Sequence, residues 1–125
     1  MALQENEIFG VLGEEGFSRL VAAFYRQVPG DDILGPMYPK DELAAAEQRL
    51  RDFLIGRFGG PDRYVESRGH PRLRMRHAPF KINVPARHRW MENMEKALVE
   101  VGLPNDVEKL LRAYFSSTAT FMINS

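Results

Sequence analysis

The sequence predicts one all-helical (all-α) domain, and three observations support this prediction. Apolar residues recur at steps of three and four along most of the chain, which is the spacing of one face of an amphipathic helix. Clusters of proline and glycine interrupt these stripes, as they do at helix ends. No run of alternating β-branched residues, internal repeat or low-complexity linker is present. A length of 125 residues fits a single hydrophobic core, so we expect one domain over residues 1–125.

The composition excludes several classes of function. Hydrophobic residues make up 44 % and charged residues 27 % of the chain, as in ordinary globular domains. The 17 basic and 17 acidic residues balance, so no overall field attracts nucleic acid or an anionic membrane. The absence of cysteine excludes disulfides, thiolate nucleophiles and thiolate-bound metals. No signal peptide or membrane-spanning stretch is evident, and we therefore expect a cytoplasmic protein.

The first two predicted helices are bounded by clear start and stop signals. The first covers residues 16–28 and must stop at Pro29-Gly30. After a constrained bend at Tyr38, the second begins at Asp41, whose side chain can cap it, and runs to about Phe58. The inward stripes are Phe17, Leu20, Val21, Phe24 and Val28 in the first helix, and Leu43, Ala46, Leu50, Phe53 and Leu54 in the second.

Two further helices are predicted in the last third of the chain. One begins at Pro85, a residue suited to a first helical position, and ends before Gly102. The other runs from about Asn105 to Ile123. The inward residues are Trp90, Met94, Ala97, Leu98 and Val101 in the former, and Val107, Leu110, Leu111, Tyr114, Phe115, Thr118 and Met122 in the latter.

Segment 63–82 departs from this regular pattern. One glycine and two prolines leave room for little more than two turns of helix, which carry Leu73, Met75 and His77. His77 follows Leu73 by four residues and therefore shares its helix face. Because Ala78-Pro79 comes next, the His77 imidazole is expected to project inward at a helix end.

The three histidines of the chain are not equivalent. His88 is predicted to face solvent, and His70 to shape or cap the start of the short helix. A single inward histidine such as His77 is more often a core residue than a ligand. No second histidine or close carboxylate pair shares its face, so a zinc site would be difficult to assemble, whereas haem iron needs only one protein ligand. Core packing and haem ligation both remain open for His77.

A cluster of arginines lies around the same segment. Such a cluster could bind the two propionates of a haem, although a solvated charged face is the simpler interpretation. A nucleic-acid surface is less favoured, because the net charge is zero and exposed aromatic residues are not interleaved with the arginines. The arginines are Arg63, Arg68, Arg72, Arg74 and Arg76 in the segment and Arg49 on the facing helix.

Three amphipathic aromatic residues, Tyr25, Tyr38 and Trp90, lie on or next to predicted inward stripes. Each carries a hydrogen-bond donor that needs a partner when it is buried. Any one of them could be an ordinary core residue with its polar atom near the surface. Together they indicate a polar pocket.

The sequence resembles the group II truncated haemoglobins, over essentially the whole chain. The stretch from Gly69 to Phe80, with His77 and Ala78-Pro79, is similar to the proximal motif of that family. Further matches are Phe24-Tyr25, Met37-Tyr38-Pro39, Ala46-Glu47-Gln48-Arg49-Leu50, Gly59-Gly60-Pro61 and Trp90. Two departures lie outside the expected pocket: Val11-Leu12-Gly13 stands where paired glycines are frequent, and Arg57-Phe58 where a Tyr-Trp pair is common.

This resemblance implies a two-over-two helical sandwich around one haem b, with His77 as the proximal iron ligand. It also implies that Tyr25, Tyr38 and Trp90 line the distal side and that Leu50 packs beside the gas ligand. Ala46 would occupy the place where many globins have a distal histidine. Other expected haem contacts are Arg49, Phe53, Tyr64, Leu73, Arg74 and Arg76.

The expected function is binding of oxygen, and also of CO and NO, in a monomer or homodimer. Two distal hydrogen bonds of about 1.4 kcal/mol each would slow oxygen release roughly a hundredfold, which argues against transport or storage. One alternative is a peroxidase-like or nitric-oxide-detoxifying enzyme that uses a separate reductase. Another is a cofactor-free helical interaction module.

Overall fold

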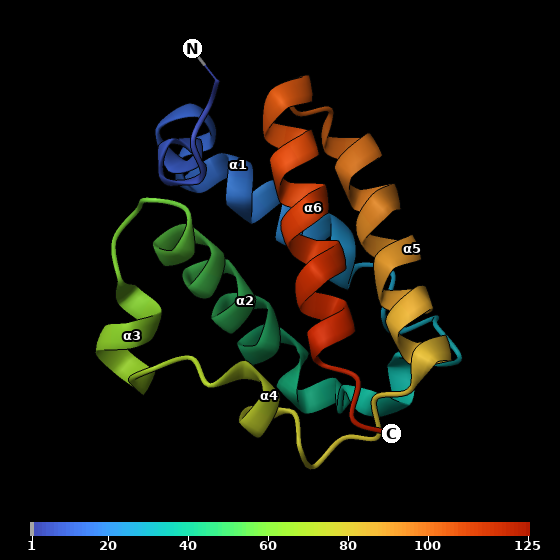
Figure 1. Cartoon of the computed structure of the whole chain (residues 1–125). Coiled ribbons are helices and arrows are strands. Elements are labelled where there is room, and N and C mark those ends of the chain that lie inside the picture. The colour runs from blue at the N-terminus through green and yellow to red at the C-terminus, as the bar shows by residue number, and fades with distance from the viewer. Residues whose placement is uncertain (1) are drawn as a thin grey trace.

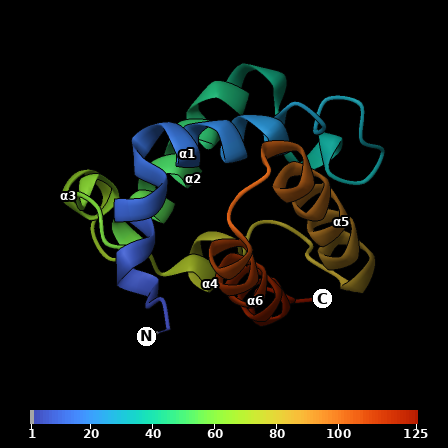
Figure 2. The ribbon, with the colours of Figure 1, turned by 90° about the horizontal axis from the view of Figure 1, so that it is seen from above.

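The structure is a computed structural model that describes residues 2–125, and these residues form helices and turns without any strand. Four long helices make up two layers (Figure 1): α1 (Ile8–Tyr25) packs on α2 (Leu43–Arg57), and α5 (Val84–Val101) packs on α6 (Asn105–Phe121). Figure 2 shows the α1 and α2 pair on one side of the molecule and the α5 and α6 pair on the other. The all-α prediction and the two-over-two arrangement are confirmed.

The core forms where the two layers meet, on the predicted inward stripes. Residues on these stripes that are only half-buried are mostly those facing an internal cavity, such as Leu50, Phe53 and Trp90. The fully buried large side chains include Phe17, Leu20, Val21, Phe24, Leu54, Ile55, Phe58, Met94, Leu98 and Leu111. None of the helices among the described residues combines the length and the apolar character needed to cross a membrane.

The first helix differs from its prediction at both ends. It begins earlier, at Ile8, and Gly13 interrupts it with a φ of 68° that favours glycine. It also ends earlier, at Tyr25 rather than Val28. The amides of Gln27 and Val28 bond three residues back instead of four, so the chain tightens into turns before the proline.

The second helix and the connection that follows it also differ from prediction. Asp41 lies inside a 3-10 turn, Lys40–Glu42, and its side chain caps no amide of the described residues. The connection from α2 to α5 contains α3 (Arg63–Arg68), which the sequence reading did not identify, and α4 (Leu73–Arg76). His77 directly follows α4, so its predicted place at a helix end is confirmed.

The last two helices lie close to their predicted bounds. Asn83 caps α5, because its side-chain oxygen accepts a hydrogen bond from the Ala86 amide at 2.9 Å. Gly102 ends α5 in the left-handed conformation that the sequence predicts there. Residues of these two long helices, of α2 and of the segment that carries His77 line one cavity.

Candidate functional site

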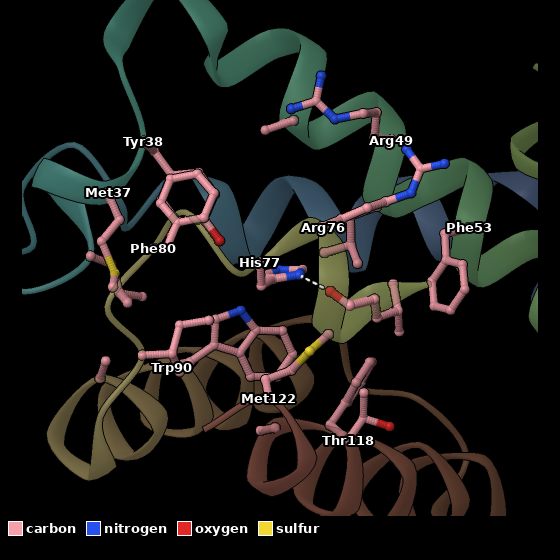
Figure 3. A pocket seen from close by; sticks show the side chains of 18 of the residues that line it. Met37, Tyr38, Arg49, Phe53, Arg76, His77, Phe80, Trp90, Thr118 and Met122 are labelled. Carbon is pink, nitrogen blue, oxygen red and sulfur yellow. Dashed lines mark hydrogen bonds between the residues drawn. The ribbon is translucent and has the colours of Figure 1, made fainter. Parts of the chain in front are cut away.

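A cavity of about 450 Å³ lies between α2, α4, α5, α6 and the loop that follows α1 (Figure 3). This volume is within the range of about 300–1,000 Å³ that is usual for small-molecule and cofactor pockets. Apolar side chains form most of its wall, and these include Leu34, Leu50, Phe53, Leu73, Phe115 and Met122.

His77 lies on the wall of the cavity formed by α4. Its Nδ1 is 2.6 Å from the backbone oxygen of Leu73, one turn earlier, which also accepts from the His77 amide at 3.1 Å (Figure 3). Donation from Nδ1–H to this carbonyl assigns the proton to Nδ1 and leaves the lone pair on Nε2. Among residues 2–125, no group of three or more histidine, aspartate or glutamate side chains could hold a metal ion. The described donors therefore suit a metal that needs one imidazole from the protein.

Three polar aromatic side chains gather on the other side of the cavity. In Figure 3, the hydroxyl of Tyr38 and the indole nitrogen of Trp90 point toward the same central space as the His77 imidazole. The rings of Tyr25 and Tyr38 meet edge to face, with centroids 5.6 Å apart. The ring of Phe24 packs against two of these side chains, with its centroid 5.2 Å from that of Tyr25 and 5.1 Å from that of Trp90.

These tyrosines remain protonated at neutral pH. Burial, followed by the neighbouring Tyr38, raises the pKa of Tyr25. Burial also raises the pKa of Tyr38, while polar contacts with Tyr25 and Trp90 oppose this rise. The contact between the two side chains thus acts on the pKa values of Tyr25 and Tyr38 in opposite directions. Each protonated hydroxyl can donate one hydrogen bond.

Arg76 supplies an unsatisfied positive group at the cavity. Its Nη2 donates to the backbone oxygens of Arg68 (2.6 Å) and His70 (3.4 Å), and its guanidinium lies 5.6 Å from the Tyr64 ring centroid. Its buried Nε finds no partner among the described residues. A buried cationic donor of this kind suits an anionic ligand group. Arg49 and Arg68 also line the cavity.

Of the predicted site residues, only Arg74 is not brought to the cavity. Its guanidinium turns away and donates to the backbone oxygens of Phe121 and Ile123 at 3.2 Å each. Two other arginines of the predicted cluster are also elsewhere: Arg63 pairs with Glu14, and Arg72 is exposed. The predicted residues that do line the cavity are Tyr25, Tyr38, Ala46, Arg49, Leu50, Phe53, Tyr64, Leu73, Arg76, His77 and Trp90.

Sequence reasoning missed several lining residues. Thr118 and Met122 could have been found, since both lie on the predicted inward stripe of the last helix. Phe80 ends the quoted motif and Met37 precedes Tyr38, so each adjoined an assigned residue. Arg87 carried no signal, because its long side chain reaches the cavity from a half-exposed position.

The predictions for the other two histidines are confirmed. His70 Nδ1 accepts a hydrogen bond from the Arg72 amide at 3.2 Å, immediately before α4 begins. His88 is exposed on α5. Neither histidine lines the cavity.

Comparison with known proteins identifies the family. The sequence profile described as bacterial-like globin matches residues 7–124. The chain is 36 % identical over 119 residues to the group 2 truncated hemoglobin YjbI of Bacillus subtilis, covering 95 % of this chain and 89 % of the relative. The chain is a group II truncated haemoglobin.

Solved structures of this family share the fold. The thermostable haemoglobin of Thermobifida fusca is 45 % identical with a TM-score of 0.90, covering 94 % of this chain and 96 % of its own. The truncated oxygen-avid haemoglobin of Bacillus subtilis is 35 % identical with a TM-score of 0.89, covering 94 % and 98 %. Truncated globins bind diatomic gases through haem, and this general function extends to the present protein.

The cavity fits a haem on its own chemistry. It offers a single imidazole, apolar walls for a macrocycle and an unpaired guanidinium nitrogen for a carboxylate. The two departures from the family pattern do not touch it. Gly13 alone makes the early break in α1, while Arg57 lies over the rings of Phe58 (5.1 Å) and Tyr114 (4.8 Å).

Proposed function

We propose that this truncated haemoglobin binds oxygen, and also CO and NO, at a haem b whose iron is held by Nε2 of His77. The observation that carries the proposal is the 2.6 Å contact between His77 Nδ1 and the Leu73 oxygen. This contact fixes the tautomer, orients the ring and increases the basicity of Nε2. The chain has no cysteine for thioether attachment, which favours a haem that is held without covalent links.

The distal donors favour a polar ligand. When bound, the haem supplies the iron that holds the gas and shifts negative charge onto an oxygen ligand. Tyr38 and Trp90 can each donate a hydrogen bond toward this charge from a cavity with mostly apolar walls. Tyr25, whose ring meets that of Tyr38 edge to face with centroids 5.6 Å apart, would orient the Tyr38 hydroxyl. Ala46 offers no donor, so the stabilisation depends on the phenols and the indole.

The arginines orient the haem. The unpaired Nε of Arg76 suits a propionate oxygen, and Arg49 and Arg68 add positive charge along the cavity. Because the Arg76 guanidinium is already held by two backbone oxygens and a tyrosine ring, little side-chain freedom is lost on binding.

The same donors support a second function. Protonated Tyr38 and Trp90 could polarise a peroxide as well as oxygen, and turnover would then require electrons from a separate reductase. Steady-state consumption of peroxide or nitric oxide, measured with and without a flavin reductase, separates an enzyme from a gas-binding protein.

Substitution of each histidine tests the iron assignment. We expect His77→Ala to lose stoichiometric haem, because no other histidine reaches the cavity. His70→Ala and His88→Ala are matched controls that should retain it. Haem is quantified as the pyridine haemochrome after reconstitution. Normal haem content with an unchanged ferrous spectrum in His77→Ala would show that another residue binds the iron.

A further inference from the structure

The segment that carries His77 has almost no packing of its own. None of residues 65–85, all of which the structure describes, is buried. The α4 helix has four residues, which is far too short to be stable in isolation. An iron ligand needs a fixed position, which a four-residue helix cannot supply by itself. Contacts from elsewhere in the chain must therefore hold it.

Residues that follow α6 supply these contacts through Asn124. Its Nδ2 donates to the backbone oxygens of His77 (3.3 Å) and Phe80 (3.0 Å). Its Oδ1 accepts from the Ile82 amide, and its own amide donates to the Ile82 oxygen, both at 2.9 Å. The side chain of Asn124 thus bonds to both ends of the turn that runs from His77 to Ile82, shortly before α5 begins.

Arg74 makes the same connection from the opposite direction. It lies on α4, three residues before His77, and its guanidinium donates to Phe121 and Ile123 at the end of α6. That end of α6 is itself fixed to α5, because Arg87 donates to the Ser116 oxygen at 3.0 Å and to Thr120 Oγ1 at 3.2 Å. The contacts of Arg74 and Asn124 therefore lead from the His77 segment to the rigid helix pair.

We propose that Arg74 and Asn124 are positioning residues, forming a clasp that holds the backbone of His77 and thereby sets the orientation of its imidazole. This inference rests on the proposed function, in which His77 holds the iron. The His77 oxygen accepts from the Phe80 amide at 2.9 Å on one side and from Asn124 on the other, so its peptide group is fixed at two points. The ring then has a fixed base from which to bond to Leu73.

Asn124→Asp tests the clasp with almost no change in shape. A carboxylate cannot donate to the two carbonyls and places a negative charge against them. We expect haem to transfer to apomyoglobin about tenfold faster than from the wild type, the effect of two lost hydrogen bonds. We also expect the iron–histidine stretching band of the ferrous protein to shift and broaden in resonance Raman spectra. A purely structural role would leave that band unchanged.

Asn105→Asp is the matched control. Asn105 is exposed at the other end of α6, and its side chain makes no hydrogen bond within the described residues. Arg74→Met provides a second test if Asn124→Asp folds poorly, and it should shift the band in the same direction. Arg74→Lys, which can still donate, should partly restore it.

Two results would overturn the inference, and they have different meanings. If the wild type shows the iron–histidine band, and Asn124→Asp and Arg74→Met match Asn105→Asp in band position and haem transfer, the clasp does not position His77. If the wild type shows no such band, the iron assignment fails and the clasp fails with it.

Discussion

The two walls of the haem cavity are held in place by different means. The distal wall carries Tyr25, Tyr38 and Trp90 on or next to long helices, with Phe24 fully buried beneath them. The proximal wall carries His77 in a stretch without a buried residue. Side-chain packing therefore fixes the proposed distal donors, whereas hydrogen bonds to the backbone fix His77, the proposed iron ligand.

A group of polar contacts supports each wall, and the two groups differ in charge. We call the contacts of Asp31 on the distal side the charged strap, and those of Arg74 and Asn124 on the proximal side are the clasp. On the distal side, Asp31 Oδ1 accepts from the amides of Ile33 and Leu34 at 2.8 Å each and from Arg89 at 3.1 Å. Its Oδ2 accepts from the buried Asn93 at 2.9 Å. Arg89 precedes Trp90 on α5 and Asn93 follows it by three residues. Asp31 therefore connects the loop that leads to Tyr38 with the helix that bears the indole. On the proximal side, the clasp uses the amide of Asn124 and the guanidinium of Arg74 in place of a carboxylate.

The largest expected difference between the walls is in packing. Phe24→Ala removes a fully buried ring and should lower the free energy of unfolding by about 3–5 kcal/mol. Met75→Ala, at a proximal residue that is 60 % exposed, should change it by no more than about 0.5 kcal/mol. Urea unfolding of the ferric proteins, followed by circular dichroism, measures both values. Similar costs at the two positions would contradict the contrast between the walls.

The second difference concerns pH. Burial raises the pKa of Asp31, but hydrogen bonds from Leu34, Asn93, Ile33 and Arg89 outweigh this and lower it to about 2 from the usual 3.8. Because the folded pKa is the lower one, the carboxylate stabilises the fold above about pH 4, by about 2 kcal/mol, and this is lost as the pH falls toward 2.

We therefore expect Asp31→Asn to destabilise the protein by about 2 kcal/mol at neutral pH and by less than half of that near pH 2.5. Urea unfolding of wild type and variant at both pH values gives the difference, in which pH effects on the rest of the molecule cancel. Asn124→Ala should show the same cost at both pH values. A cost of Asp31→Asn that does not depend on pH would rule out the charged strap.

The sequence predicted the fold and most of the cavity for identifiable physical reasons. The long helices bury one face each, so their stripes repeat with the helical period and can be read locally. His77 could be identified because it shares a helix face with Leu73 and because Pro79, which ends the helix, follows it two residues later. The short α3 helix could not, since six residues give too few turns for a stripe.

Long-range polar contacts were the part that the sequence did not show. Asn124 meets His77 from 47 residues away, and Asp31 meets Asn93 from 62 residues away, so no local spacing marks either pair. Arg74, predicted among the haem contacts, does not line the cavity, and no local spacing indicated its partners either. A flexible side chain on an exposed turn can reach several acceptors, and only the folded chain shows that the end of α6 lies closer.

The third prediction compares how the walls act on the gas ligand. Trp90→Phe removes a distal donor, and we expect oxygen to dissociate about tenfold faster, the effect of losing about 1.4 kcal/mol. Carbon monoxide is less polar and should respond much less. Asn124→Asp, a proximal change, should not discriminate between the two gases. Stopped-flow replacement of oxygen by CO, and of CO by NO, gives the rates. Equal increases for both gases in Trp90→Phe would indicate a steric gate.

The smallest expected effect belongs to Tyr25 and separates direct from indirect donors on the distal wall. We propose that the Tyr25 hydroxyl orients that of Tyr38, because the two rings meet edge to face, and Tyr25→Phe keeps the ring packing while removing only this hydroxyl. A neutral hydrogen bond of about 0.5–1 kcal/mol corresponds to roughly two- to fivefold faster oxygen release, which is less than for Trp90→Phe. Adding Tyr25→Phe to Tyr38→Phe should have no further effect, because the hydroxyl being oriented is then absent. The same stopped-flow rates test this. If Tyr25→Phe equals or exceeds Trp90→Phe, or still acts in the absence of the Tyr38 hydroxyl, then Tyr25 donates to the ligand directly and the order of donors in this pocket must be reversed.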